Sequence, residues 1–214
     1  MDVDTCIRER RSIRKFKDRP LDWEKITRIV DSARFAPSAG NIKNYKLVVI
    51  RKDDARQKLA SAAFDQDWML DAPVHIVIMA EPDKAERFYG ARGDRLYTVQ
   101  NCAAAIENML LTASSLGLAS CWVGAFDEEK VKHILNAPDG PEPQAIIVLG
   151  YADEKPEMPS RMELEHQVYL DRWGGKGQGD KAKGYKSVAI KESIDNTKKT
   201  IKKFVSKIKK QVKE

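Results

Sequence analysis

The stretch Arg10-Arg11-Ser12-Ile13-Arg14-Lys15-Phe16 gathers three guanidinium groups around one hydroxyl. A further arginine, Arg161, comes much later, in a turn punctuated by Pro156 and Pro159. Guanidinium groups present forked donors that match the oxygens of a phosphate monoester. A fold that brings the two segments together would therefore build a phosphate site. The alternative is a solvated basic helix end, because cations are favoured at a helix C-terminus.

Two loop segments lie between these arginines. The first is Ala36-Pro37-Ser38-Ala39-Gly40-Asn41, whose small residues would let the backbone approach a flat ligand while the Asn41 amide pairs with polar ring edges. The second is Cys121-Trp122-Val123-Gly124-Ala125-Phe126, which lies where a strand gives way to a helix and backbone N–H groups are free to donate. Each segment is also compatible with an ordinary turn.

The sequence offers no nucleophile–base pair and no metal site. The histidines fall in a strand and in helical stretches, where we expect them to be structural or exposed: His75, His133 and His166. The cysteines lie in apolar segments without zinc-ligand spacing, and we expect buried thiols: Cys6, Cys102 and Cys121. Neither GxGxxG nor GxxxxGKS occurs. Such a chain is expected to leave its chemistry to a cofactor.

The chain of 214 residues has a net charge of +6, which is unevenly distributed. Residues 176–214 hold 13 Lys and 4 acidic residues, whereas the rest holds 25 basic and 28 acidic residues. The body is thus mildly acidic, and the overall charge does not indicate nucleic-acid binding by the main domain. No apolar run approaches the ~20 residues that span a bilayer, and the acidic N-terminus lacks a signal peptide's apolar stretch. We expect a cytoplasmic protein.

The hydrophobic pattern predicts an α+β domain in which helices accompany a sheet of about four strands. The expected helices cover residues 3–10, 23–34 (with Asp22 as the cap), 53–64, 96–116 and 127–135. The expected strands cover residues 46–51, 74–80, 120–123 and 144–151. Residues 83–95 are charged and contain two glycines, so they predict a mobile surface segment. The helix at 96–116 is apolar on nearly every side, which is typical of a core helix.

Over residues 3–173 the chain resembles the nitroreductase-like family of FMN flavoproteins, because four motifs occur in the family's order. The first two are R-[RH]-S-x-[RK]-x-F at residues 10–16 and A-P-S-x-x-N at residues 36–41. The third, G-L-G-[ST]-x-W-[IV]-G, corresponds to residues 117–124. The C-terminal pattern G-Y-P…R…Y-x-R-W corresponds to Gly150-Tyr151, Arg161 and residues 169–173.

The resemblance implies where FMN would be bound. Arg10, Ser12 and Arg161 would hold its phosphate, with Arg11 in the same basic run. Arg14 would face the N1–C2 edge of the ring, where a fixed cation stabilises the anionic reduced flavin. The ring would be bordered by loop residues of the partner subunit and by backbone groups near flavin N5: Pro37, Ser38, Ala39 and Asn41 in the loop, and Val123 and Gly124 near N5.

The resemblance also implies an obligate homodimer with a small, mainly antiparallel sheet of four to five strands surrounded by helices. Its activity would be ping-pong: NAD(P)H gives a hydride to flavin N5, and a nitroaromatic, a quinone or a similar small acceptor then takes the electrons. FMN is expected rather than FAD, because there is one compact basic site and no dinucleotide fingerprint. The alternative is a non-enzymatic flavin-binding or interaction protein with a basic recruitment tail.

The chain departs from the family pattern in three places. Lys43-Asn44-Tyr45 stands where the family usually has Q-P-W, which bears on the pocket rim and the substrate. Asn101 stands for a frequent Asp in the long helix, and Glu163 stands for a frequent Pro after the phosphate arginine. None of these changes removes a proposed FMN ligand.

The composition divides the chain into a body at 1–173, a Gly/Lys-rich linker at 174–186 and a Lys-rich amphipathic helix at 187–214. The helix carries a narrow apolar stripe and is too weak to be stable alone in water. We expect it to dock on the acidic body of the same dimer. Pairing with a second tail, and binding to an anionic membrane surface or to nucleic acid, are the alternatives.

Overall fold

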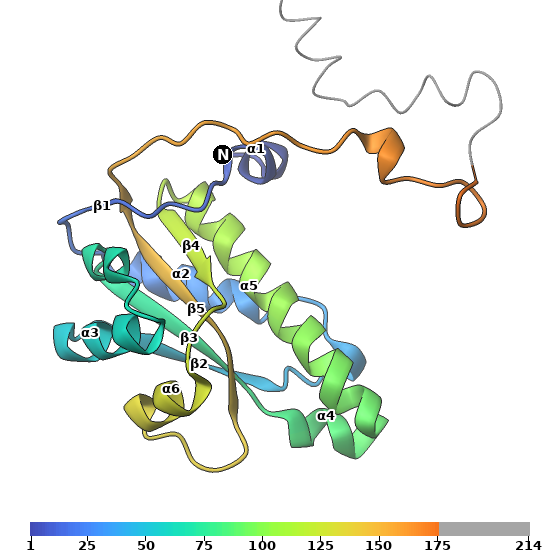
Figure 1. Ribbon diagram of the computed structural model, residues 1–214, viewed down its shortest axis with the longest axis horizontal. Helices are drawn as coiled ribbons and strands as arrows, with labels where there is room; N and C mark the ends of the chain where they lie inside the picture. Colours follow the sequence, from blue (N-terminus) through green and yellow to red (C-terminus); the bar gives the residue numbers. More distant parts are fainter. Residues whose placement is uncertain (176–214) are drawn as a thin grey trace, which may run out of the picture. The chain divides into compact units, whose positions relative to one another are not determined.

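The computed structural model describes residues 1–175, of which Met1–Met158 form one compact unit and the residues from Pro159 on belong to a second (Figure 1). The tail helix expected at 187–214 and most of the linker lie outside the described residues. Among residues 1–175, no helix is long and apolar enough to cross a membrane.

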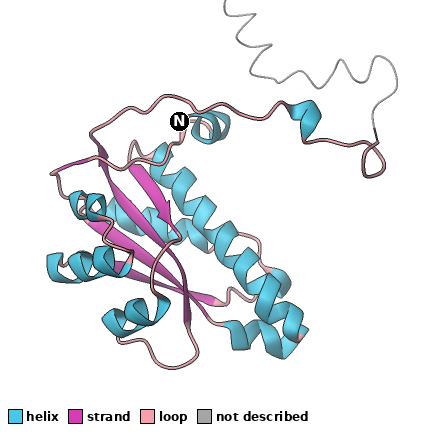
Figure 2. Ribbon diagram, in the orientation of Figure 1, coloured by secondary structure: helices cyan, strands magenta, loops and turns pink. Residues whose placement is uncertain are grey.

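A sheet of five strands forms the centre of the first unit (Figure 2). Its strands are β1 (Phe16–Lys17), β2 (Tyr45–Ile50), β3 (Val74–Ala80), β4 (Ala119–Val123) and β5 (Glu142–Ala152). All pairings between them are antiparallel, and β5 pairs with β1, β3 and β4. The expected small antiparallel sheet is therefore confirmed, with β1 as the strand that the hydrophobic pattern did not indicate.

Strand β3 is buried along its whole length, as its continuous apolar run predicts. Its alternate side chains point to opposite faces of the sheet. Ile76 and Ile78 belong to one hydrophobic cluster and Val77 and Met79 to the other. Two separate cores therefore lie on the two faces of the sheet.

Helices cover both faces. On the first, α2 (Trp23–Ala33) packs against the long α5 (Thr98–Ser115), and their buried side chains share one cluster with β3 and β5. The second face is covered by α3 (Asp53–Ala62), the short 3-10 helix at Asp67–Asp71, and α6 (Glu128–Leu135). Helix α1 (Val3–Glu9) packs on α5 (Figure 1). Together the layers enclose the sheet from both sides.

The aspartates that precede α6 and α2 differ in whether their side chains cap the helix, and only Asp22 was predicted as a cap. Asp127 precedes α6 and accepts a hydrogen bond from the Lys130 backbone N–H at 3.0 Å. Asp22 occupies the same position before α2, but its side chain makes no capping bond. Asp22 thus marks the start of α2 without stabilising it in the expected way.

Residues 83–95 are more regular than their composition predicts. They fall within α4 (Pro82–Tyr89) and a π-helical turn at Gly93–Tyr97, which leads directly into α5. Pro82 starts the helix, and buried Ala85 packs so closely that a Cβ at Gly93 would collide with the Ala85 carbonyl. The glycine serves this contact between turns, so its presence does not indicate mobility.

The second unit contains a 3-10 turn at Leu164–His166. Beyond it, the rings of Tyr169 and Trp173 meet edge to face with centroids 5.3 Å apart.

Gly150 lets the N-terminal segment cross the end of β5. Phe16 pairs with Ala152, and its ring lies directly over Gly150. A Cβ at Gly150 would come 2.6 Å from Phe16 Cδ1 and 3.1 Å from Pro73 Cδ. The missing side chain therefore makes room for the buried ring.

We expect Gly150→Ala to destabilise the fold by about 1–3 kcal/mol, because the added methyl group overpacks a buried site. Urea denaturation measures the change. Gly124→Ala is the matched control, since its Cβ would meet Trp122 at an ordinary 3.7 Å. Equal stabilities of the two variants would contradict the steric argument.

His75 gives the fold a pH dependence. It is fully buried in β3 with Nε2 2.9 Å from the Met69 carbonyl oxygen, and burial lowers its pKa from 6.5 to about 4. The unfolded chain therefore binds the proton more tightly. Between pH 7 and pH 4.5 we expect a loss of about 2 kcal/mol of unfolding free energy. His75→Gln, which does not titrate, should lack this loss in urea titrations at the two pH values.

Candidate functional site

The basic run begins where α1 ends and is tied to the outer edge of β4. Ser12 forms an isolated parallel bridge with Ser120, and the Ile13 N–H donates to the Ser120 carbonyl at 3.1 Å. Ile13 is buried, whereas Ser12 and Arg14 on either side of it are exposed. The alternation of a short extended segment therefore places both predicted ligands outside the core.

Glu154 holds the same segment from the other side. Its Oε1 accepts hydrogen bonds from the backbone N–H groups of Arg14, at 2.5 Å, and Lys15, at 3.1 Å. Next to it, the Asp153 N–H donates to the Lys15 carbonyl at 2.9 Å. The residues that follow β5 thus contact the basic run directly. Sequence reasoning missed Glu154, because a contact over 140 residues leaves no local pattern.

A cavity of about 360 Å³ opens beside this segment. Its lining includes Arg10, Arg11, Glu154 and Lys155, together with Ser114 at the end of α5. Arg11 is restrained there, since its Nη1 donates to the carbonyls of Arg8, at 2.6 Å, and Arg10, at 2.8 Å. The charged lining of the cavity consists of three cations, Arg10, Arg11 and Lys155, and two carboxylates, Glu9 and Glu154, so it offers guanidinium donors to an anionic group with only a small excess of positive charge.

Cys121 lies beneath the run as a buried thiol, like Cys6 and Cys102. Burial raises the pKa of Cys121, and this outweighs the opposing influence of Arg14 and the Ser12 hydroxyl. The thiol therefore stays protonated near neutral pH, in agreement with the expected structural role.

The junction after β4 lies near Arg14. The Arg14 guanidinium carbon is 5.8 Å from the centre of the Trp68 ring. Two residues earlier, the Gln66 side-chain amide donates to the carbonyls of Ala63, at 2.9 Å, and Ala125, at 3.3 Å. Ala125 directly follows Val123 and Gly124, so these contacts bring the predicted N5 segment into the neighbourhood of Arg14. Gln66 and Trp68 were not predicted, because only the fold brings them here.

The predicted ring-bordering loop lies elsewhere in the chain. The Ala39 N–H donates to Asn101 Oδ1 at 2.9 Å, in the first turn of α5, whereas Ser114 at the other end of α5 lines the cavity. At 1.5 Å per residue, these two helix positions are about 20 Å apart. One chain therefore does not bring the loop to its own basic run (Figure 1).

A buried polar network fixes this loop. Asn101 Nδ2 donates to Asn44 Oδ1 at 2.8 Å, and Asn44 Nδ2 donates to Thr98 Oγ1 at 2.8 Å. All three residues are at most 3% exposed. Two departures from the family pattern, Asn44 and Asn101, are thus partners of each other.

The loop backbone is held in unusual conformations. Gly40, Asn41 and Lys43 all have positive φ, and a Cβ at Gly40 would collide with the Tyr89 hydroxyl. Lys43 Nζ donates to Asn41 Oδ1 at 2.5 Å. The Asn41 amide nitrogen is therefore the end of that side chain left free to donate to a ligand.

Arg161 belongs to the second unit, where it is exposed. That Arg161 holds the FMN phosphate together with Arg10 and Ser12 stays a prediction.

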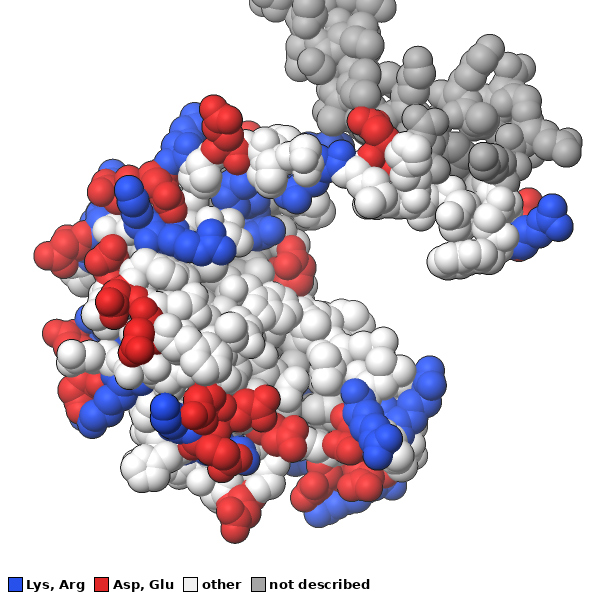
Figure 3. Space-filling model, viewed as in Figure 1, with Lys and Arg blue, Asp and Glu red and all other residues white. Residues whose placement is uncertain are grey.

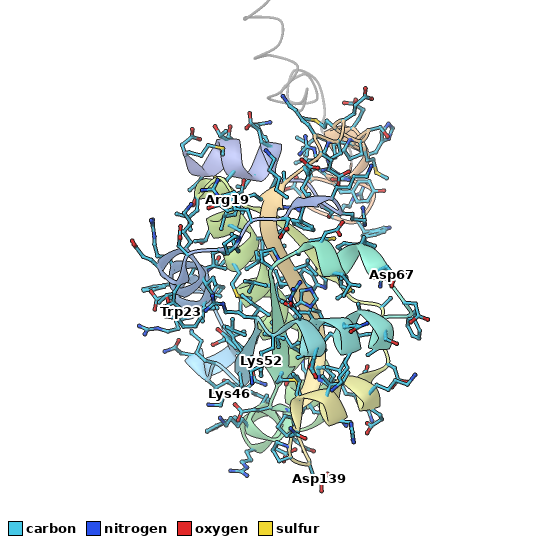
Figure 4. All side chains as sticks on the ribbon, turned by 90° about the vertical axis from the view of Figure 1, so that its left-hand side faces the viewer. Arg19, Trp23, Lys46, Lys52, Asp67 and Asp139 are labelled. Carbon is cyan, nitrogen blue, oxygen red and sulfur yellow. The ribbon has the colours of Figure 1, made fainter. Side chains whose placement is uncertain are left out.

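A second cavity, of about 410 Å³, contains none of the predicted site residues. It is lined by basic and acidic side chains together, among them Arg19 and Lys52, which the side view of Figure 4 labels, and Asp18 and Asp53. Its lining carries one more cation than carboxylates, as the lining of the first cavity does, so charge alone does not separate the two. The first cavity is the stronger candidate because predicted site residues, Arg10 and Arg11, line it.

Comparison with known proteins decides the family. The model of the "Nitroreductase family" matches residues 7–66 and 60–151. The chain belongs to the nitroreductase family. This stretch includes the basic run, the loop of residues 36–41 and the β4 junction.

Among its relatives in this family is a protein of Archaeoglobus fulgidus, provisionally named an NADH dehydrogenase/NAD(P)H nitroreductase. It is 34% identical over 171 residues, covering 77% of this chain and 94% of the relative. A Bacillus subtilis protein named FMN reductase [NAD(P)H] is 23% identical over 188 residues, covering 80% and 76%. The crystal structure of a nitroreductase family protein from Clostridium difficile superposes with a TM-score of 0.72 at 30% identity, covering 80% of this chain and 99% of that one. The nitroreductase fold is thereby confirmed.

Asn101→Asp restores the family's frequent residue, yet we expect it to destabilise this chain by about 1–3 kcal/mol. The carboxylate can still accept from Ala39 but cannot donate to Asn44 Oδ1, which is left facing another acceptor. Urea denaturation tests this. Gln100→Glu makes the same charge change at an exposed neighbour on α5 and should be close to neutral.

Proposed function

We propose that this protein is an FMN-dependent oxidoreductase. It passes a hydride from NAD(P)H through flavin N5 to a nitroaromatic, a quinone or a similar small acceptor. Membership of the nitroreductase family carries the proposal. The names of two relatives, which refer to FMN reduction and to NAD(P)H, support the cofactor and the reductant. A cytoplasmic location would give such an enzyme access to NAD(P)H.

The phosphate of FMN would be held by Arg10, Ser12 and Arg161, with Arg11 shaping the turn. Of these residues Arg10 and Arg11 line the cavity, and guanidinium groups are strong partners for phosphate oxygens. Arg11 already donates to two carbonyls of its own segment, so its contribution would be mainly to hold Arg10 in place.

The isoalloxazine ring would lie between Arg14 and the backbone of Val123 and Gly124. Bound FMN supplies the hydride chemistry, because its N5 accepts and returns the hydride. Arg14 would place a positive charge at the N1–C2 edge and stabilise the reduced anionic form. The N–H groups after β4 would orient the ring at N5. The acceptor would then be chosen by the pocket rim.

The active unit would be a homodimer. Pro37, Ser38, Ala39 and Asn41 belong to a loop anchored at Asn101, about 20 Å along α5 from Ser114 at the basic cavity. The partner's loop would border the ring instead. Figure 3 shows a largely uncharged surface in the middle of the face that displays β4 and α5. On these elements the apolar residues Val99 and Trp122 are 48% and 39% exposed. Such exposed apolar residues are expected on a surface that a partner subunit would cover.

The proposal predicts that the purified full-length chain is a yellow dimer. Flavin released by heat should run as FMN, and anaerobic NADH or NADPH should bleach the protein until a quinone or nitroaromatic restores the colour. Arg10→Ala should raise the FMN dissociation constant roughly tenfold or more, because a charge-assisted phosphate contact is lost. Lys46→Ala removes an exposed charge on β2 and should leave FMN binding unchanged.

Released FAD would overturn the cofactor assignment. A yellow protein that neither nucleotide bleaches would overturn the reductant. Light scattering that finds a monomer with full FMN occupancy would overturn the shared site.

A further inference from the structure

We propose that Glu154 is a positioning residue that sets the direction of Arg14 in the flavin site. This inference rests on the proposed function, because Arg14 acts there through its charge. Glu154 itself lies in the segment after β5, outside every motif that identifies the family by sequence.

The geometry fixes the backbone of the turn at consecutive amides. The Ile13 N–H is bound by β4, those of Arg14 and Lys15 by one Glu154 oxygen, and Phe16 is paired with Ala152. A carboxylate that accepts two adjacent N–H groups makes stronger hydrogen bonds than a neutral acceptor. The Arg14 Cα therefore has a single well-defined position relative to β4.

The side chain of Arg14 has a second restraint. Its guanidinium carbon lies 5.8 Å from the centre of the Trp68 ring, within reach of a cation–π contact. With its backbone held by Glu154 and its head group near Trp68, Arg14 is fixed at both ends. A cation that must face one edge of a flavin gains from such preorganisation, since no reorganisation is then needed during the reaction.

The charge of Glu154 argues against a simple electrostatic role. It lines a cavity together with Arg10, Arg11 and Lys155, where a carboxylate weakens the binding of any anion. Its two hydrogen bonds lie at the surface, and Glu154 belongs to neither hydrophobic core, so its loss would loosen the turn locally without unfolding the domain. A residue that neither attracts the phosphate nor supports the core contributes through the geometry that it imposes.

Two variants separate position from charge. Glu154→Gln removes the charge but keeps an oxygen that can accept from both N–H groups, whereas Glu154→Ala removes both. Asp153→Asn is the control, because it removes the same charge from an exposed neighbour. For each full-length protein, hydrogen exchange of the peptide covering residues 12–16 is measured without flavin. FMN affinity and the flavin midpoint potential are measured with it.

We expect Glu154→Ala to exchange Arg14 and Lys15 amides faster than Glu154→Gln, while melting temperatures stay alike. The FMN dissociation constant of Glu154→Ala should be roughly tenfold above that of Glu154→Gln. Its midpoint potential should be lower, because a displaced Arg14 stabilises the anionic reduced flavin less. Asp153→Asn should match the wild type in exchange.

Equal behaviour of the Gln and Ala variants in affinity and potential would overturn the positioning role and leave only a charge effect. Equal hydrogen exchange of residues 12–16 in the Gln and Ala variants would show that Glu154 does not hold the Arg14 and Lys15 amides, whether or not flavin binds. A wild-type protein that binds no FMN would overturn the proposed function and with it the role in tuning the potential. The exchange data would still decide the contact between Glu154 and the turn.

Discussion

The pairing of β5 on both of its edges is the constraint on which the rest of this structure depends. β3 bonds to one edge and β4 to the other, so β5 is enclosed within the sheet and carries buried side chains into both cores. Strand β1 pairs with the last residues of β5, Tyr151 and Ala152. The N-terminal segment must therefore pass from the outer edge of β4 across the end of β5, and Gly150 is what permits that crossing. The place of Arg14 follows from this route.

Much of the fold could be predicted because its signals are local. A continuous apolar run predicted β3, and the hydrophobic pattern predicted helices close to α2 and α6. The failure at residues 83–95 has a physical reason. The charged side chains of this segment lie on the solvent side of α4. Position 93 is a glycine because a Cβ there would collide with the Ala85 carbonyl, a contact that no local sequence pattern reveals. Composition alone could not distinguish a solvated helix from a mobile loop.

From the sequence, candidate site residues could be proposed only where the residue type by itself indicates a ligand. The arginines around a hydroxyl suggested a phosphate partner, with a solvated basic helix end as the alternative, so Arg10 and Ser12 could be named as candidates. Arg14 was assigned to the flavin ring only through the family resemblance. Glu154, Gln66 and Trp68 carry no such signature, because they act through backbone groups and a ring that the fold brings near. The same holds for Asn44 and Asn101. Each departs from the family pattern alone, and only the structure shows that their amides bond to each other.

The buried amide pair of Asn44 and Asn101 also holds the loop of residues 36–41 in place, because Asn101 accepts from the Ala39 N–H. A loop that moved freely would not need positive φ at Gly40, Asn41 and Lys43, nor an anchor in the first turn of α5. Such conformations cost free energy and persist where the surroundings enforce them. Within its own chain the loop lies at the opposite end of α5 from the basic run. In the proposed homodimer, this loop would border the flavin of the second copy. In this arrangement α5 would serve as a spacer that sets how far one subunit's loop reaches toward its partner's flavin.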